Sequence, residues 1–470
     1  MKENENSEQD DFADYSFSAK IQLFVLFFFI GVLNHLGTIL VMTGGRLLTI
    51  ELDMKPYVTL YTSVATIFSI ITRMVNSKLC LKVSYKKRVI IICFWMIFGY
   101  LSMFTVLVLH ENALKHYNAL CFVLTFIPCF FLGSSYAFGE SAMIAYLRLF
   151  PKTLIAGWSS GTGVSGMMGG GLNLLTQLLD NFSLKFLYLV LTPVGPLYLF
   201  LFLWTFKLLK KDRNSLLEGI DAINEPVIED KKEQDNNKDI EAIEAINDEN
   251  RESDFNKKIE SLKDEKTLNE MNKKNKTMSW EHFKDVMHMC GRVIINLGFI
   301  YFTQFVCVNS LVIQNSNKID ISFLPKSTND DDEIVRKGKF EFVNMFYQLG
   351  MFTTKTFIKL VRKIQPIEVY TIAITSITII YFIEYYTGFL PWWTFPILNY
   401  ILGIFSGGTY AGGFYVILHS GQVLLDYKEL TVNIATIFND GGTFLSGLVG
   451  YVLLNFVIDD DSPFDGKKLE

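Results

Sequence analysis

Residues 21–43 read IQLFVLFFFIGVLNHLGTILVMT, and this stretch decides the class of fold. It contains no Asp, Glu, Lys or Arg, and its apolar residues occupy every side of a helix instead of one face. Its length suits an α-helix that crosses the hydrocarbon core of a bilayer, which takes about 20 residues. The stretch therefore predicts a transmembrane helix.

Similar apolar blocks follow along the chain of 470 residues, half of which are hydrophobic. The eleven blocks are 21–43, 57–76, 88–110, 119–149, 158–180, 184–208, 291–313, 340–361, 366–387, 389–419 and 430–457. A long hydrophilic segment separates the sixth block from the seventh. This pattern predicts an all-α polytopic membrane protein with about eleven transmembrane helices, six before the hydrophilic segment and five after it.

The hydrophilic segments set the domain boundaries. We expect residues 21–209 to form an N-terminal six-helix bundle and residues 279–457 to form a C-terminal five-helix bundle. Between them, residues 210–278 are dense in Asp, Glu, Lys and Asn and nearly lack aromatic residues, so they cannot bury enough apolar surface to fold alone. We expect this segment to be a disordered linker, and residues 1–20 and 458–470 to be tails.

Some blocks predict irregular helices. The fourth and tenth are long enough to tilt or break, and glycine pairs at 407–408 and 412–413 permit bending or close helix packing in the tenth. Before the seventh block, the apolar residues between Trp280 and Cys290 fall on one helical face. This face predicts a short amphipathic helix on the membrane surface at the start of the C-terminal bundle, with an extension of the seventh span as the alternative.

Lys and Arg gather in the loops on one side of the expected spans. These loops lie at residues 77–88, at 148–152, after 207 and at 359–363. Short basic loops remain in the cytoplasm. We therefore expect a cytoplasmic N-terminus and linker, and a C-terminus in the lumen or outside the cell.

Composition argues against several classes of protein. The six cysteines form no CxxC or Cys/His cluster, so we expect neither a disulfide framework nor a metal site. The net charge of −5 lies largely in the hydrophilic segments and does not indicate a nucleic-acid partner. The sequence shows no nucleophile–base set, phosphate-binding loop or ATP-binding motif. We expect no enzymatic activity and no cofactor, and any pumping must use an ion gradient.

The most specific motif lies in the fourth and fifth blocks. It consists of Gly139-Glu140, Phe150-Pro151 and the string Trp158-Ser159-Ser160-Gly161-Thr162-Gly163, followed by Gly166 and Gly169-Gly170-Gly171. Shorter patches in the same order are Asn34-His35, Trp280-x-x-Phe283-Lys284, Tyr347-Gln348-x-Gly350-x-Phe352, Gly388-Phe389-Leu390-Pro391 and Leu445-Ser446-Gly447-Leu448. Together these patches resemble the battenin family of lysosomal and vacuolar membrane proteins along nearly the whole chain outside the linker.

The resemblance implies a major-facilitator-like fold and residence in a lysosomal or vacuolar membrane. It also implies a secondary transporter that exports small polar metabolites, either basic amino acids or glycerophosphodiesters, and supports organelle pH homeostasis. The partners would be the bilayer, a small polar solute and protons. Two alternatives stay open: an equilibrative nucleoside-type carrier, and a non-transporting membrane protein that organises vesicle trafficking.

The sequence departs from the family pattern at three places. The family Glu in the seventh span is replaced by Gln304, which cannot titrate, and the family Arg in the eighth span is replaced by Lys355. A Lys keeps the positive charge but not the bidentate geometry of Arg. A His-Asn pair of the tenth span corresponds here to Tyr415-Val416. The resemblance therefore supports the expected fold more strongly than it supports the expected cargo site.

Ionisable residues within the spans are candidates for function, because a charge inside a bilayer usually faces a partner or a wet cavity. Glu140 could bind a proton or a cationic group, Lys355 could attract an anionic cargo, and Asp440 could line the cavity or relay protons. A structural ion pair or, for Lys355, a position near the cytoplasmic face is the alternative for each. Glu384 and Arg73 lie near span ends and are expected at the membrane interface.

Polar residues of the motif supply further candidates. Ser159, Ser160 and Thr162 could offer hydroxyls from a helix start to an anionic group, whereas the glycines around them suit tight helix packing. The other expected cavity residues are Asn34, His35, Tyr347 and Gln348.

Two short patterns concern processing and sorting. Asn181 begins an Asn-Phe-Ser glycosylation sequon in the expected luminal turn between spans five and six. Leu216 and Leu217 end a string that resembles an acidic dileucine signal, which sorting adaptors would bind in the cytoplasm.

Overall fold

The computed structural model describes residues 17–80, 83–147, 154–179, 182–223, 276–318, 338–357, 367–419, 423–424 and 427–457. Within these ranges the regular structure consists of helices, with no strand. The all-α prediction is therefore confirmed for this part of the chain.

The N-terminal half contains the helices that precede the linker. They are α1 (Phe17–Thr43), α2 (Gly45–Glu51), the short turn η3 (Lys55–Tyr57), α3 (Leu60–Val75), the π-helical turn η4 (Asn76–Cys80), α4 (Tyr85–Asn112), α5 (Asn118–Leu124), α6 (Phe126–Leu147), α7 (Leu154–Leu178), α8 (Leu184–Val190) and α9 (Val194–Ile223).

The C-terminal half contains the helices that follow the linker. They are α12 (Trp280–Val306), the π-helical turn η5 (Cys307–Leu311), α13 (Val312–Lys318), α14 (Lys339–Thr356), α16 (Glu368–Thr387), α17 (Thr394–His419), α18 (Lys428–Val452) and the π-helical turn η7 (Leu453–Val457).

Each of the eleven expected apolar blocks coincides with one or more of these helices. Eight helical segments in the described ranges are long and apolar enough to cross a membrane. These findings confirm a polytopic membrane protein, and the number of spans stays a prediction.

The long fourth block breaks, as its length allowed, between α5 and α6 at Thr125. Pro128 lies in the first turn of α6, where a missing backbone N–H costs no helical hydrogen bond. The tenth block does not break: α17 is one helix that begins at Thr394. The sixth block, which was not expected to break, is divided into α8 and α9 around Pro193.

Two boundaries differ from the prediction. Helix α12 runs without interruption from Trp280 to Val306, so the C-terminal bundle begins with an extension of its first span and not with a separate surface helix. Helix α9 continues to Ile223, so residues 210–223 are helical although they were assigned to the linker. The rest of that segment up to residue 275, and the two tails apart from residues 17–20, lie outside the described residues.

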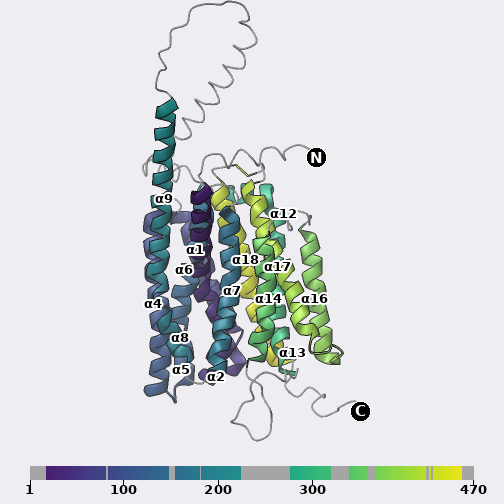
Figure 1. The fold of residues 1–470 in the computed structure, drawn as a ribbon. Coiled ribbons are helices and arrows are strands. Elements are labelled where there is room, and N and C mark those ends of the chain that lie inside the picture. Colours follow the sequence, from purple (N-terminus) through teal and green to yellow (C-terminus); the bar gives the residue numbers. More distant parts are fainter. Residues whose placement is uncertain are drawn as a thin grey trace, which may run out of the picture.

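The two halves stand side by side as two bundles (Figure 1). Helices α1, α4 and α6 lie in the N-terminal bundle, and α16 lies on the far side of the C-terminal bundle. Between the bundles, α7 packs along α14 and α3 packs along α18. We call the end where α1, α4, α12 and α18 begin the upper end, since it is uppermost in Figure 1.

Glycines of α7 allow close packing on two sides. A Cβ at Gly161 would collide with the backbone oxygen of Phe28 in α1, and a Cβ at Gly163 would lie 2.8 Å from the Cα of Phe352 in α14. The first contact holds the N-terminal bundle together, and the second joins the two bundles. The packing interpretation is confirmed for Gly161 and Gly163, whereas a Cβ at Gly171 would meet nothing within 4 Å.

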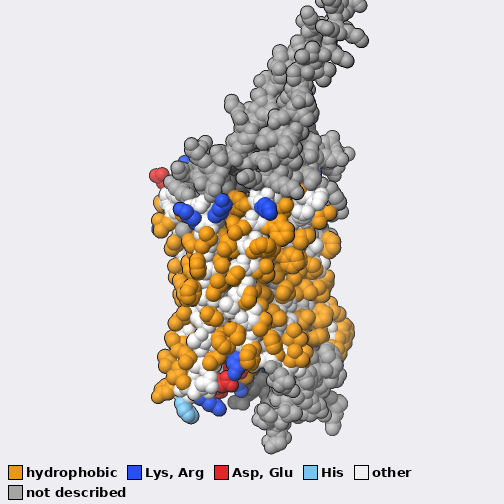
Figure 2. Space-filling model, turned by 60° about the vertical axis from the view of Figure 1, so that its left-hand side comes forward, with side chains coloured by type: hydrophobic (Ala, Val, Ile, Leu, Met, Phe, Trp, Pro, Cys, Tyr) orange, Lys and Arg blue, Asp and Glu red, His pale blue; other side chains and the backbone are white. Residues whose placement is uncertain are grey.

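Apolar side chains cover the middle of the bundle in a broad belt, and Lys and Arg lie near its ends on the face seen in Figure 2. Several large hydrophobic residues are more than half exposed, among them Phe94, Phe200 and Ile372. Such a belt suits the hydrocarbon core of a bilayer.

Candidate transport site

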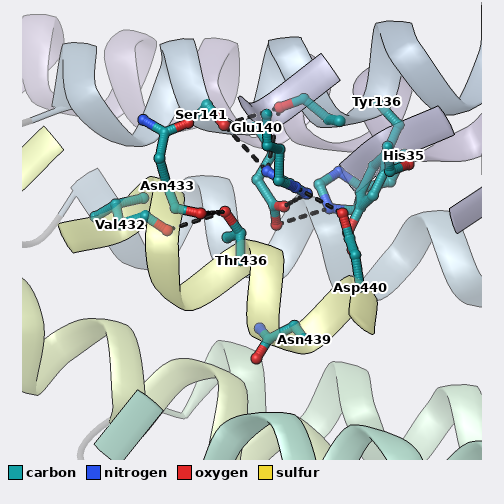
Figure 3. Close-up of polar contacts among 12 residues, drawn as sticks. His35, Tyr136, Glu140, Ser141, Val432, Asn433, Thr436, Asn439 and Asp440 are labelled. Atoms are coloured by element: carbon teal, nitrogen blue, oxygen red, sulfur yellow. Dashed lines mark hydrogen bonds and ion pairs between the residues drawn. The ribbon is translucent and has the colours of Figure 1, made fainter. Parts of the chain in front are cut away.

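Arg73 of α3 is the centre of a buried charged network between the two bundles. Its Nη2 lies 2.6 Å from Oε2 of Glu140 in α6, and its Nε lies 2.7 Å from Oδ2 of Asp440 in α18. All three side chains are at most 6 % exposed. Figure 3 shows Asp440 pointing from α18 toward Glu140 and His35, whereas the neighbouring Asn439 points to the other side.

The remaining nitrogen of the Arg73 guanidinium is also bonded. Nη1 donates to the backbone oxygen of Ala137 at 3.2 Å and to Oγ of Ser141 at 3.0 Å. The guanidinium carbon lies 5.3 Å from the ring centroid of Tyr136. A planar guanidinium can satisfy several acceptors at once, which is what a buried charge requires.

The interfacial position expected for Arg73 is wrong. Turn η4 continues α3 as far as Cys80, so Arg73 lies about two helical turns below that end. Its side chain is fully buried. Asp440 lies inside α18, which is continuous through it.

Glu140 joins the network to two more helices. Its Oε1 accepts a hydrogen bond of 2.6 Å from the hydroxyl of Tyr410 in α17 and lies 3.4 Å from Nε2 of His35 in α1. The His35 ring packs edge-on against Tyr136 and Trp158. The carboxylate is therefore held by cationic and polar groups from several sides.

Lys355 of α14 is held differently. Its Nζ donates to Oγ1 of Thr162 at 3.2 Å and lies 4.2 Å from the ring centroid of Tyr410. The side chain is buried, and among the described residues no carboxylate lies within ion-pair distance of the ammonium. We call Arg73, Glu140, Asp440 and Lys355, together with Tyr410, the charged cluster.

The charged cluster balances two cations against two carboxylates and connects the bundles. The pairs Arg73–Asp440, Tyr410–Glu140 and Lys355–Thr162 each join the N-terminal half to the C-terminal half. Any movement of one bundle relative to the other must change these three contacts.

Several buried polar atoms of neighbouring residues have no hydrogen-bond partner within the described ranges. They are Nε1 of Trp158, Oγ of Ser159, Oδ1 of Asn34, both side-chain polar atoms of Gln304 and Oδ1 of Asn439. A buried polar group that lacks a partner costs about 1–3 kcal/mol. A water molecule or a polar ligand could satisfy these atoms.

The structure brings together five of the residues expected from the sequence: Glu140, Asp440, Lys355, Thr162 and His35. The other expected residues have different contacts. Ser160 bonds to Ala156 O of its own helix, Tyr347 bonds to Ser406, Gln348 packs against Gly166, and Asn34 donates to Tyr136 O. Ser159 is one of the residues with an unpartnered oxygen.

The string 158–163 does not begin a helix. Helix α7 starts at Leu154, so the backbone amides of Ser159 and Ser160 are inside the helix and are not available to an anion. The helix-start interpretation of these hydroxyls is therefore wrong, although Thr162 does contact Lys355.

Sequence reasoning missed two members of the charged cluster, Arg73 and Tyr410. The sequence contains a signal for Tyr410, because it is a large side chain between the glycine pairs 407–408 and 412–413, where the neighbouring residues are small. For Arg73, the sequence shows a positive charge within an apolar block, but it does not show how far from the helix end the side chain lies.

Three other expectations concern residues away from the cluster. Glu384 lies in the last turn of α16, near the end of the helix as expected; it is buried, and its Oε2 accepts from the backbone N–H of Leu390 in the turn between α16 and α17. Asn181 lies outside the described residues, and Leu216 and Leu217 lie in the part of α9 whose side chains are not described. The expectations for Asn181, Leu216 and Leu217 therefore stay predictions.

The arrangement of helices is shared with solved transporters. The human organic anion transporter MFSD10 matches with a TM-score of 0.51 at 11% identity, over 92% of this chain and 94% of that one. The major facilitator superfamily proton:xylose symporter XylE matches with a TM-score of 0.56 at 9% identity, over 95% of this chain and 97% of that one. At such low identity these matches establish the fold alone, which is the major facilitator fold.

Sequence comparison supplies the family. Battenin of Dictyostelium discoideum is 24% identical over 442 residues, which are 92% of this chain and 93% of that protein. Residues 25–459 match the family described as CLN3 protein. The resemblance to the battenin family is thereby confirmed, and the chain has the fold of membrane transporters. This protein belongs to the CLN3 protein family.

Proposed function

We propose that this protein is a secondary transporter that carries a small organic anion of the glycerophosphodiester class and exchanges protons at its charged cluster. The observation that carries the proposal is the state of Lys355, a buried cation whose described contacts are a hydroxyl and an aromatic ring. Both carboxylates of the cluster are already bonded to Arg73.

This distribution of partners favours an anionic cargo over a basic amino acid. A cationic cargo would need a free carboxylate, and it would have to compete with the Arg73 guanidinium for Glu140 or Asp440. An anionic group would find donors instead. Ser159 lies three residues before Thr162, so both lie on one side of α7, and the Oγ of Ser159 and the Nε1 of Trp158 are unused.

Protons are the proposed coupling ion, and Glu140 and Asp440 are their proposed carriers. Protonation of either carboxylate removes a negative charge from Arg73 and weakens a contact within the network. For Asp440 this contact joins the two bundles. The exit of cargo with protons would also support the pH balance of an acidic organelle.

We place the protein in the lysosomal or vacuolar membrane, with the upper end in the cytoplasm. The basic residues of the loop around 77–88 support this orientation. Leu216 and Leu217 are the proposed sorting signal for delivery to that membrane, read by cytoplasmic adaptors.

Flux through proteoliposomes tests the proposal. Purified protein is reconstituted, and the flux of radiolabelled glycerophosphoinositol is compared with that of radiolabelled lysine, with and without a proton gradient. We expect flux of the anion that the gradient stimulates, and little flux of lysine. Flux of lysine alone would contradict the proposed cargo class, and equal flux in Glu140→Gln and wild type would remove Glu140 from the mechanism.

A further inference from the structure

Tyr410 contacts both the proposed proton carrier and the proposed cargo-binding cation. Its hydroxyl donates to Oε1 of Glu140 at 2.6 Å, and its ring lies under the Lys355 ammonium at 4.2 Å. The ring of one buried side chain therefore lies between a carboxylate of the N-terminal half and an ammonium of the C-terminal half.

Local packing fixes this position. A Cβ at Gly407 would collide with Thr354 of α14, and a Cβ at Gly408 would lie 2.7 Å from the Tyr370 ring of α16. The two glycines therefore let α17 lie directly against α14 and α16. This close approach sets the ring of Tyr410 beside Lys355, which follows Thr354 in α14.

We propose that Tyr410 is the positioning residue that couples the charge state of Glu140 to the binding of anionic cargo at Lys355. This inference rests on the proposed function. With Glu140 ionised, the Tyr410 hydroxyl is fixed and its ring holds the Lys355 ammonium. With Glu140 protonated, the hydroxyl loses its charged acceptor, and the ring no longer holds Lys355 in one place.

The coupling works in both directions, because a change in cargo affinity caused by a proton requires an equal change in proton affinity caused by the cargo. An anion that draws Lys355 away from the ring frees Tyr410 in the same manner as protonation does. Tyr410 would then connect the two events without touching the cargo's charged group.

Other charged and titratable groups also face Glu140 and limit what Tyr410 can do alone. They come from several helices: His35 from α1, Arg73 from α3, Tyr136 from α6 itself, Tyr301 from α12, Lys355 from α14 and Asp440 from α18. Within the described part of the chain, Tyr410 contacts both Glu140, through its hydroxyl, and Lys355, through its ring.

The substitution Tyr410→Phe tests the coupling, because it keeps the ring and removes only the hydroxyl. Tyr381→Phe in α16 is the matched control, because it removes another buried hydroxyl that lies outside the cluster. That hydroxyl donates to the backbone oxygen of Phe395 in α17, the helix that also carries Tyr410. Flux of radiolabelled glycerophosphoinositol is measured in proteoliposomes with and without a proton gradient. We expect the gradient to stimulate wild type and Tyr381→Phe by about fivefold or more, and Tyr410→Phe by less than about twofold.

A second measurement does not depend on the cargo. Hydrogen exchange of the purified proteins is compared at neutral and acidic pH, after correction for the intrinsic effect of pH on exchange. In wild type and Tyr381→Phe we expect the exchange rates of residues 136–142 of α6 and of residues 407–413 of α17 both to change with pH. In Tyr410→Phe we expect the exchange rates to change with pH only in the α6 segment.

The outcomes separate the two proposals. If wild type moves no glycerophosphoinositol, the proposed function fails, and the exchange data alone decide the role of Tyr410. Gradient stimulation in Tyr410→Phe equal to that of wild type, or an unchanged response of residues 407–413, would overturn the proposal for Tyr410.

Discussion

Arg73 and Lys355 carry the same charge in the same cluster, but the protein holds them in different ways. Each nitrogen of the Arg73 guanidinium has an oxygen acceptor, and two of those acceptors are carboxylates. The Lys355 ammonium has one hydroxyl acceptor and an aromatic ring. The loss of these two cations should therefore change stability in opposite directions.

Arg73→Met should destabilise the protein strongly. The substitution leaves Glu140 and Asp440 buried without their shared cation, and breaking a buried pair in this way costs about 3–5 kcal/mol. Thermal unfolding of the purified variant should show a clearly lowered Tm. The triple change Arg73→Met, Glu140→Gln and Asp440→Asn should recover part of that loss, since neither carboxylate then remains buried and charged without its cation. A Tm of Arg73→Met equal to that of wild type would contradict the buried network.

Lys355→Met should keep or raise the Tm while transport is lost. A buried cation without a carboxylate partner costs desolvation energy, and an apolar residue of similar length avoids that cost. The measurement pairs thermal unfolding with flux of glycerophosphoinositol. Lys355→Arg, which restores the charge and the residue of the family pattern, should return part of the flux. A lowered Tm together with unchanged flux would show that Lys355 is structural.

Single residues differ in how far the sequence reveals them. Glu140 and Asp440 were found because a carboxylate within an apolar block is visible in the sequence itself. The partnership between them was not visible, because it passes through Arg73 and depends on where α3 ends and on the register of three helices. Tyr410 was missed for the same reason, since a Tyr in an apolar block has no charge that would mark it.

Helix α7 shows what the glycines of the family motif do. Gly161 faces α1 so closely that an added methyl group would meet backbone, which cannot move aside as a flexible side chain can. Gly171 lies in the same helix with nothing within 4 Å of an added Cβ. The two glycines therefore form a matched pair for testing helix packing.

Gly161→Ala should destabilise the protein by about 1–3 kcal/mol through overpacking. Gly171→Ala should instead stabilise it by about 1 kcal/mol, because alanine favours the helix and meets no neighbour. Thermal unfolding of both purified variants checks the contrast. Equal effects of the two substitutions would argue against close packing of α1 and α7.

The helices themselves were largely predictable, because long apolar blocks can satisfy their backbone groups in a bilayer only as helices. The errors lie at boundaries where the sequence turns polar. The apolar face between Trp280 and Cys290 predicted a surface helix, with an extension of the seventh span as the alternative, and the structure has the extension, because α12 runs through this stretch. Residues 210–223 were assigned to the linker because of composition, although α9 extends through them.

The two bundles are joined at the upper end by a second buried ion pair. Nη1 of Arg88 in α4 lies 2.7 Å from Oε1 of Glu429 in α18, and both side chains are fully buried. Asn76 Nδ2 donates to Asn433 Oδ1 at 2.9 Å between η4 and α18. Contacts of this kind hold one arrangement of the bundles.

A double-substitution cycle at this ion pair should give a large coupling. Arg88→Met should lose about 3–5 kcal/mol of stability because Glu429 then loses its buried cation. Adding Glu429→Leu should recover most of that loss, as an apolar pair of similar volume is often neutral. Thermal unfolding of the single and double variants gives the coupling. Strictly additive effects would mean that the two side chains do not interact.

The two-bundle layout was visible in the sequence as six blocks, a charged segment and five blocks. The pairing of α3 with α18 and of α7 with α14 was not visible, because helices that are far apart in the chain carry no mark of their partner. That pairing places the charged cluster between the bundles, so the location of the site follows from the whole molecule and not from any one motif.

The interface between the bundles should be sufficient to assemble them without a covalent link. Residues 1–223 and 276–470, produced together as two chains, should copurify and restore flux of glycerophosphoinositol. The physical reason is that α3 packs along α18, α7 packs along α14, and the pairs Arg73–Asp440 and Arg88–Glu429 are buried across the interface. The same two chains with Arg88→Met in the first should copurify less, which controls for nonspecific association in detergent.

This experiment also separates a transporter from a trafficking protein that acts through residues 224–275. Two chains that assemble and transport, yet fail to restore function in cells, would favour the trafficking role, whereas two chains that never associate would contradict the interface itself.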